Sequence, residues 1–433
     1  MSITFKGQPI WPFVRIYLFQ ILGATNHIEA HKVESSKIKT VLKALFAYNP
    51  FTVFSRHKNW LFTATERRKA IVDKHVLRVS GFMSEIDKNC LVVEKPSTHQ
   101  SHLSKKHIAE KHIVSEAYLL VSAHMIERFL RHNDLKIDNE QILLKILNEY
   151  SLTFDYKYFV RYLWSQKIAT DLLLRLSPKP EKVLIECPYN ILGYVWSFHQ
   201  HNIKVIELQH GVIGNSHYAY ILPKNSIFSP DEIWVYGKRD VRFLKEFNPQ
   251  YAAEIFDTGL YYLDYAYRAF NQDIFAQYRK QYKHIIVFAG QAAVEEAVHQ
   301  FIDSAAAENP ETLFIYVPRF VDEVFTVKRS NVIFAPGVNI YQYLKWCDFH
   351  STVSSTTCLE AAYYGKRTIF YNFENLATNY YDGTLIEGQG VRYINSPHQF
   401  RTAIESLTTS PENINSDGFS KFSLNHVSNL LKR

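Results

Sequence analysis

The chain has 433 residues, more than one ordinary hydrophobic core serves, so we expect two domains of about 150–250 residues each. Hydrophobic residues make up 47% of the chain and charged residues 21%, which excludes a long disordered region. The formal net charge is +7. Because no recognition-helix, zinc-finger or RNA-binding signature accompanies it, we expect a membrane surface or a phosphorylated substrate as the anionic partner, and no nucleic acid.

Residues 1–110 are aromatic and basic with weak periodicity, and their pattern is the hardest to interpret. The segment Ile10–Gly23 is apolar, but it contains a proline, an arginine and a glutamine and is too short to span a bilayer. We interpret it as a core helix in preference to an interfacial membrane helix. The segment Trp60–Lys69 predicts a strand that runs into a charged turn. Apolar residues at helical spacing, among them Ile108, Ile113 and Ala117, predict helices between residues 107 and 176.

Strands and helices alternate from residue 178 onward. Short apolar runs predict strands at Lys182–Cys187, Lys204–Leu208 and Asp231–Tyr236, with helices at 190–199 and 239–247. Residues 265–283 are polar with a helical pattern, and we interpret them as an interdomain linker. A second set follows, with strands at 284–288, 313–317, 331–334, 349–353 and 367–371 and helices at 292–307, 340–346, 357–364 and 397–407.

This alternation predicts two doubly wound α/β units with parallel sheets that face a cleft, preceded by an aromatic-rich, partly helical N-terminal extension. We place the N-terminal domain at residues 1–268, with a helical and basic region at 1–176 and an α/β part at 178–268. The C-terminal domain covers residues 275–410. Residues 411–433 form a tail or helix that we expect to pack back on the N-terminal domain.

Cysteine and histidine usage bears on redox state and metals. Cys90, Cys187, Cys347 and Cys358 are scattered and form no CxxC pair, which favours buried thiols in a reducing compartment over disulfides or a zinc site. The 19 histidines show no metal-ligand spacing, so we expect no metal and no other cofactor. We expect a cytoplasmic protein, with a peripheral position on the cytoplasmic face of the inner membrane as the alternative.

A polar loop after the predicted strand Lys204–Leu208 carries the first group of candidate catalytic residues. His210 follows the strand end and precedes a glycine, and imidazole can remove a proton from a hydroxyl near neutral pH. A histidine that only holds the loop is the structural alternative. Glu186 ends the preceding strand and Glu207 lies within an apolar run, so either carboxylate can orient the histidine or act as the base itself.

The second group follows strands of the C-terminal domain. Ser354, Ser355, Thr356 and Thr357 precede a helix, and this run has more hydroxyls than one helix cap needs, which favours a phosphate or diphosphate ligand. Glu360 lies one turn into that helix and could reach ribose hydroxyls, with a plain helix residue as the alternative. Three further strand ends add small residues or a cation, namely Gly290-Gln291, Arg319 and Gly337.

The sequence resembles the two-domain GT-B glycosyltransferases, in particular bacterial enzymes of surface-polysaccharide biosynthesis (capsule, lipopolysaccharide O-antigen and teichoic-acid types). The resemblance rests on Leu208-Gln-His-Gly211, on Ser354-Ser-Thr-Thr-Cys-Leu-Glu-Ala361 and on Gly365-Lys-Arg-Thr-Ile-Phe370, and it covers residues 180–405. The serine and threonine run is similar to the phosphate-binding motif of enzymes that use CMP-linked sugars and of teichoic-acid polymerases. Those enzymes carry a His-Pro where this chain has Pro318-Arg319, which counts against a CMP-linked donor.

The resemblance implies metal-independent transfer of a sugar from a nucleotide-sugar donor to a hydroxyl of a glycan or lipid-linked glycan acceptor. The donor would be bound by the C-terminal domain, and the acceptor by the N-terminal domain through Gln209, Asn215 and His217. Three alternatives stay open: a CDP-polyol phosphotransferase of teichoic-acid type, a catalytically inactive nucleotide- or sugar-binding protein, and a nucleotide-sugar epimerase.

Overall fold

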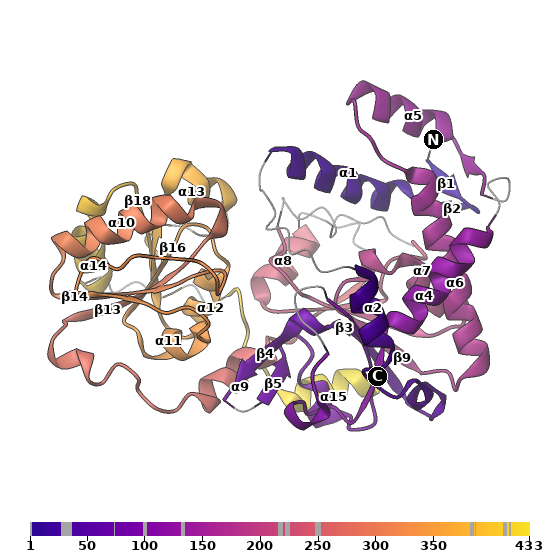
Figure 1. Ribbon diagram of the computed structural model, residues 1–433, viewed down its shortest axis with the longest axis horizontal. Helices are drawn as coiled ribbons and strands as arrows, with labels where there is room; N and C mark the ends of the chain where they lie inside the picture. The colour runs from indigo at the N-terminus through magenta and orange to yellow at the C-terminus, as the bar shows by residue number, and fades with distance from the viewer. Residues whose placement is uncertain are drawn as a thin grey trace. The chain divides into compact units, whose positions relative to one another are not determined.

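A computed structural model describes residues 2–26, 37–72, 74–97, 102–130, 135–214, 220, 226–246, 253–381, 385, 387–409, 414 and 417–433. The chain forms two compact units. Unit 1 comprises Met1–Tyr262 and Phe422–Arg433, and unit 2 comprises Leu263–Lys421. Figure 1 shows a twisted sheet with helices around it in each unit.

Unit 1 is built on a parallel sheet. Within the described residues this sheet has seven strands, in the spatial order β12 (Glu254–Asp257), β11 (Glu232–Val235), β10 (Lys204–Leu208), β9 (Lys182–Ile185), β3 (Asn59–Ala64), β6 (Leu91–Lys95) and β7 (His112–Ser115). Smaller antiparallel sheets join β1 (Thr4–Phe5), β2 (Gln8–Pro9) and β8 (Ile137–Asp138), and join β4 (Arg68–Ile71) and β5 (Lys74–Leu77).

The helices of unit 1 cover this sheet. They are α1 (Trp11–Asn26), α2 (Lys37–Leu45), α3 (Met83–Ile86), α4 (Ala117–Phe129), α5 (Glu140–Glu149), α6 (Tyr156–Leu176), α7 (Leu192–Gln200), α8 (Lys238–Glu246) and α15 (Leu424–Lys432). One core cluster joins buried residues of α4, α6 and α7 to strand residues such as Trp60, Leu91 and Val183. Helices α6 and α7 approach closely at Gly193, where an added Cβ would lie 2.2 Å from the Leu163 carbonyl oxygen. Only glycine fits there.

Helix α1 contributes to a second core cluster of unit 1. Phe13, Val14, Ile16 and Leu18 are buried in it, which confirms the prediction of a core helix for the part of α1 whose side chains the structure describes. Within the described residues no helix combines the length and apolar character that crossing a membrane requires.

Unit 2 has a second parallel sheet. In the part of the chain that the structure describes it has six strands, in the order β15 (Val332–Phe334), β14 (Thr312–Val317), β13 (His284–Ala289), β16 (Phe349–Thr352), β17 (Arg367–Tyr371) and β18 (Val391–Ile394). The helices are α10 (Glu295–Glu308), α11 (Ile340–Trp346), α12 (Thr357–Tyr363), α13 (Leu376–Tyr380) and α14 (Phe400–Thr409). Helix α9 (Tyr261–Ala269) begins at the end of unit 1.

The prediction of two parallel α/β sheets is confirmed, and several elements differ from the sequence pattern. Ile113, expected in a helix, lies in strand β7, and Ile108 lies in a loop. The first 115 residues supply β3, β6 and β7 in addition to helices. The helix expected at 265–283 begins earlier and ends at Ala269. Strands β12 and β18 were not predicted, because each is short and only partly buried.

Candidate functional site

Both sheets reverse their strand order at one point. In unit 2, β13 and β16 are neighbours, and the strands run outward from them in the order 3-2-1-4-5-6 when numbered along the chain. Unit 1 follows the same order with an added strand at one edge, and its reversal lies between β3 and β9. In such sheets the loops at the carboxyl ends of the two central strands diverge and leave a crevice for a ligand. Each unit therefore has one favoured place for chemistry.

Glu186 lies at the reversal point of unit 1. Its side chain is buried and accepts hydrogen bonds from the hydroxyls of Thr63 (2.8 Å) and Ser80 (2.6 Å), and its carboxylate lies 3.9 Å from Arg67 Nε. Burial raises the pKa of Glu186, although Arg67 and the two hydroxyls oppose the shift. Because its hydrogen bonds tie the end of β9 to β3 and to the segment before α3, Glu186 fixes the shape of this edge.

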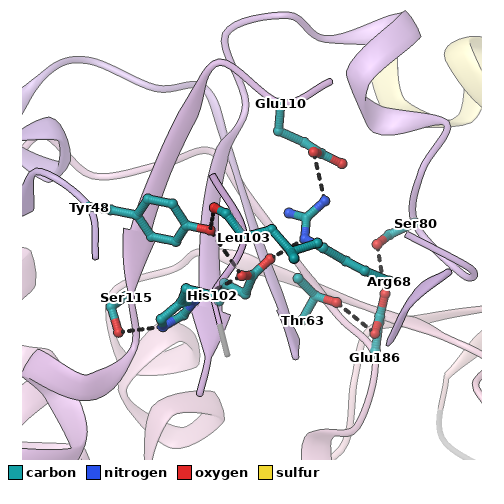
Figure 2. A network of polar contacts seen from close by, with 10 residues as sticks. Tyr48, Thr63, Arg68, Ser80, His102, Leu103, Glu110, Ser115 and Glu186 are labelled. Atoms are coloured by element: carbon teal, nitrogen blue, oxygen red, sulfur yellow. Dashed lines mark hydrogen bonds and ion pairs between the residues drawn. The ribbon is translucent and has the colours of Figure 1, made fainter. Parts of the chain in front are cut away.

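A larger ionic network continues along the same edge (Figure 2). Arg68 is fully buried, and its guanidinium contacts Glu94 Oε2 at 2.6 Å and Glu110 Oε2 at 2.9 Å. His102 bridges Glu94 (2.9 Å) and Ser115 (3.1 Å), and Tyr48 donates to Glu94. Burial raises the pKa of Glu94, but the bond from His102 and the charge of Arg68 outweigh it and lower the pKa. Sequence reasoning missed this network, because its members come from four separate segments.

His210 follows β10, beside the reversal point. It is 9% exposed, and its Nε2 lies 3.1 Å from the Tyr189 hydroxyl. Burial raises the pKa of Tyr189, with further contributions from Cys187 and Glu207, so this phenol stays protonated near neutral pH. Ring contacts with Tyr189 and Tyr220 hold the imidazole. Glu207 is buried within β10, in the same electrostatic environment as Cys187 and Tyr189.

Of the three candidate acceptor-binding residues, the structure describes only Gln209. Gln209 is buried, and its amide is committed to the Gly211 carbonyl (2.8 Å), to Asp240 (2.8 Å) and to the Tyr236 amide (2.6 Å). These bonds hold the loop on which His210 lies. Asn215 and His217 lie outside the described residues.

The hydroxyl-rich loop of unit 2 follows β16, one side of the reversal point. Ser354, Ser355, Thr356 and Thr357 are all half-buried. Thr357 Oγ1 donates to Ser355 Oγ (3.1 Å) and lies 3.0 Å from Nε2 of His350. His350 is fully buried on β16, its Nδ1 lies 3.2 Å from Thr368 Oγ1, and burial lowers its pKa to about 3. The neutral imidazole of His350 therefore holds the Ser354–Thr357 loop through its contact with Thr357.

The other strand ends of unit 2 carry the remaining donor candidates. Gly290 and Gln291 follow β13, Arg319 follows β14, and Gly337 follows β15 with a φ of +72°. A Cβ on Gly290 would lie 2.8 Å from the Tyr316 hydroxyl and 3.0 Å from Pro318 Cα, so this glycine lets the two loops pack together. Arg319 is exposed, and no ion pair with another described residue holds it. Parallel strands bring all these residues to one edge, next to the Ser354–Thr357 loop.

Glu360 and Glu323 have buried carboxylates among the described residues of unit 2. Glu360 is 2% exposed on α12, so its carboxylate is covered rather than presented on the surface. Glu323 accepts hydrogen bonds from Tyr316 and from His299 Nε2 (2.8 Å), and the His299 ring stacks on Phe325 at 4.5 Å. Sequence reasoning missed this cluster, which ties the segment after β14 to α10. No group of three or more His, Cys, Asp or Glu side chains among the described residues is arranged to hold a metal ion.

Known proteins resemble this chain in structure but not in sequence. No family profile and no curated protein matches the sequence. The glycotransferase of kitacinnamycin is similar with a TM-score of 0.52 and 10% identity, over 88% of this chain and 99% of that one. The S. aureus MnaA–UDP co-structure has a TM-score of 0.51 and 10% identity, over 87% and 96%. The wall teichoic acid polymerase TagF has a TM-score of 0.50 and 10% identity, over 98% and 97%.

At such low identity these similarities establish the fold alone. The chain has a GT-B-like fold, with two Rossmann-type α/β units whose sheets are both parallel. The fold class predicted from the sequence is therefore confirmed. The roles assigned to individual site residues stay predictions.

Proposed function

We propose that this protein is a metal-independent glycosyltransferase that moves a sugar from a nucleotide-sugar donor to a hydroxyl of a surface-glycan acceptor. In this proposal unit 2 binds the donor nucleotide and unit 1 carries the base that activates the acceptor. The acceptor hydroxyl transfers its proton to the base while its oxygen attacks the anomeric carbon. The nucleotide leaves with the bonding electron pair on its terminal phosphate oxygen.

The observation that carries the proposal is the composition of the unit 2 strand ends. Half-buried hydroxyls of Ser354–Thr357 lie on one side of the reversal point and the Gly290–Gln291 turn on the other. Arg319 adds an exposed cation at the next strand end. Hydroxyl donors with one cation suit a diphosphate, because they bind its charged oxygens through hydrogen bonds and an ion pair.

The base assigned in unit 1 is His210. It lies at a strand end on a loop that Gln209 holds, and the Tyr189 hydroxyl fixes the position of its ring. An imidazole near neutral pH is suited to general-base catalysis. Glu207 and Glu186 are the next candidates, but both are buried carboxylates, and Glu186 already accepts two hydroxyl hydrogen bonds.

Nucleotide binding tests the donor half of the proposal. The intact protein is titrated calorimetrically with UDP, GDP, CMP and CDP, and its melting temperature is recorded with each. A nucleotide that binds only the folded state stabilises it by about 2.7 kcal/mol at a concentration 100 times its Kd. We expect one nucleotide to bind and Arg319→Gln to weaken it, with the surface variant Arg401→Gln as the matched control. No binding by any of the four would contradict the proposal.

Product analysis separates the transferase from its alternatives. A CDP-polyol phosphotransferase, which the similarity to a wall teichoic acid polymerase keeps in view, leaves a phosphodiester in the product. An epimerase turns over nucleotide sugar without any acceptor, and an inactive binding protein loses no biological activity in His210→Ala. A glycosidic bond formed only when acceptor is present supports our assignment. We further propose a cytoplasmic location with peripheral contact to the inner membrane, where a lipid-linked acceptor would be found.

A further inference from the structure

An exposed apolar and basic surface lies near the beginning of unit 1. Phe46 is 87% exposed, Phe51 71%, Leu42 52% and Phe54 47%. All four lie on α2 or on the turn and 3-10 helix η1 (Pro50–Phe54) that follow it. We call this set, together with the exposed Lys43 and Arg56, the Phe46 surface.

The segment that carries these side chains is firmly anchored. Ala44, Tyr48, Val53 and His57 alternate with the exposed residues and are buried. Tyr48 donates to the Leu103 carbonyl (3.0 Å), and both ring nitrogens of His57 lie within hydrogen-bond distance of backbone carbonyls. The exposed rings therefore project from a fixed support, because the inner side of the same segment belongs to the core.

The segment that carries the Phe46 surface is basic. Residues 37–58 include five lysines and arginines and no aspartate or glutamate. Strand β7 contacts η1, and the pKa of its His112 is lowered by burial and by the charges of His57, Lys105 and Lys111, with Asp87 opposing them. Glu94 and Glu110 are buried in the Arg68 network and do not offset this charge, whereas the exposed Glu181 pairs with Lys58 at 3.1 Å and offsets one basic residue.

We propose that the Phe46 surface binds an anionic lipid bilayer. Exposed rings on a fixed support can insert between lipid headgroups and acyl chains. Lysine and arginine next to the rings are attracted to anionic headgroups. This interaction does not depend on which nucleotide or acceptor the protein uses.

Vesicle sedimentation of the intact protein tests this inference. The probes are vesicles of phosphatidylcholine alone and of phosphatidylcholine mixed with phosphatidylglycerol. We expect binding to the mixed vesicles and a decrease with added salt. The combined variant Phe46→Ser, Phe51→Ser, Phe54→Ser should weaken binding at least about ten-fold, because each ring contributes apolar area. Lys43→Glu with Arg56→Glu should weaken it by roughly five-fold or more per position, the effect of one basic residue at an anionic surface.

Matched controls lie on α5 and directly after its last residue, in another part of unit 1 (Figure 1). Tyr150→Ser removes an aromatic ring that is 61% exposed, and Lys145→Glu reverses an exposed charge. Both should bind vesicles like the parent. Melting temperature and nucleotide affinity, measured on every variant, report the fold and the proposed enzyme function separately.

Four results would overturn the inference. In the first two, the parent does not bind the mixed vesicles, or the triple Phe variant binds them as well as the parent does. In the third, gel filtration shows that the parent is a dimer and that the triple Phe variant is a monomer. In the fourth, a single-stranded oligonucleotide displaces the parent from vesicles, and its own binding requires the same three phenylalanines. The last two would assign the surface to a second copy or to nucleic acid.

Discussion

The carboxyl edges of the two sheets have the same strand order but hold their polar groups differently. In unit 1 the edge is filled with buried charges that pair with one another, above all Arg68 with Glu94 and Glu110. In unit 2 the equivalent edge presents hydroxyls and glycines, and the buried His350 beneath it is neutral. A compensated ionic edge is rigid and can tune a neighbouring acid or base, whereas an edge of hydroxyl donors with one exposed cation, Arg319, is suited to accept an anion.

This difference predicts that substitutions at the two edges have different consequences. Changes in unit 1 should affect proton transfer or stability, and changes in unit 2 should affect nucleotide affinity. A unit 1 variant that changed only nucleotide affinity, or a unit 2 variant that changed only proton transfer, would contradict this assignment.

The largest effect is expected from His210→Ala. Removal of a positioned general base lowers kcat by about 10²–10⁴-fold. Nucleotide affinity should change little, because the donor contacts are assigned to unit 2. His210→Asn should not restore turnover. The measurement pairs kcat, in the presence of acceptor, with nucleotide affinity by calorimetry on the same protein.

The control for this experiment is His201→Ala, which removes a histidine near Asp171 at the end of α7. It should leave kcat within about three-fold, too small an effect for a general base. If His210→Ala instead lowered melting temperature and nucleotide affinity together, a structural role would replace the catalytic one, and Glu207 and Glu186 would be tested next.

The ionic edge of unit 1 can be broken with Arg68→Met. This leaves Glu94 and Glu110 buried without their cation, and loss of one partner of a buried pair costs about 3–5 kcal/mol in the free energy of unfolding. Arg67→Met is the matched control, because its side chain is 27% exposed and lies 3.9 Å from Glu186. It should cost about 1 kcal/mol or less. Equal losses in urea denaturation would show that the Arg68 network is not a distinct unit.

A pH experiment on Glu116 examines the same edge. Burial raises the pKa of Glu116 from 4.5 to about 7, against the opposing effects of Lys95 and of the hydrogen bond from Tyr194. A folded-state pKa above the unfolded value stabilises the protein below pH 4.5, and this contribution is lost as the pH rises through about 7. Glu116→Gln, which still accepts from Tyr194, should therefore be close to neutral at about pH 5 and stabilising by about 2–3 kcal/mol at about pH 8.

Urea denaturation of the parent and Glu116→Gln at both pH values checks this prediction. Glu149→Gln on the exposed end of α5 is the control and should show no pH-dependent difference. A difference of opposite sign would mean that Glu116 is ionised and paired in the folded state.

The comparison also shows what the sequence could predict. Strands β10 and β17 match their predicted bounds, because each is a continuous apolar run between turn residues. In the first 115 residues β3 overlaps the predicted strand segment, but β6 and β7 were missed, since they are short and are buried by helices far along the chain. Helical spacing suggested a helix around Ile113, but pairing of β7 with β6 determined the local structure there.

The candidate site residues also separate into those that local sequence could predict and those that only the fold brings together. His210 and Ser354–Thr357 were predicted from local sequence, because a polar loop after an apolar strand is visible in one segment. The Arg68 network and the Glu323–His299–Tyr316 cluster were not, because they join residues 7–46 positions apart that only folding brings together. Gln209 and Glu360 were identified as binding candidates, but burial, which the sequence does not report, directs their side chains inward.

At the edge of unit 2, Ser355→Ala should raise the apparent KM for the donor or lower turnover by about ten-fold or more, because Ser355 is assigned to the donor phosphate. One or two hydrogen bonds to a charged oxygen have this value. Ser304→Ala, an exposed serine on α10, is the matched control. Isothermal calorimetry with the nucleotide identified above provides the measurement, and an unchanged Kd and KM would refute the assignment.

The smallest effect concerns His350, which orients the Ser355 loop without being assigned a contact with the donor. In the neutral ring, Nε2 can donate to Thr357 while Nδ1 accepts from Thr368. His350→Gln places an amide near the position of Nε2 and should keep donor affinity close to that of the parent. His350→Asn cannot reach Thr357 and should weaken affinity roughly five-fold, the value of about one net hydrogen bond. A purely structural role predicts equal loss of melting temperature in both variants and no difference in Kd between them.

Because burial holds the pKa of His350 at about 3, this histidine should add no pH dependence to nucleotide affinity near neutral pH. A change in the nucleotide Kd with pH in the parent that is lost in His350→Gln would contradict a neutral ring.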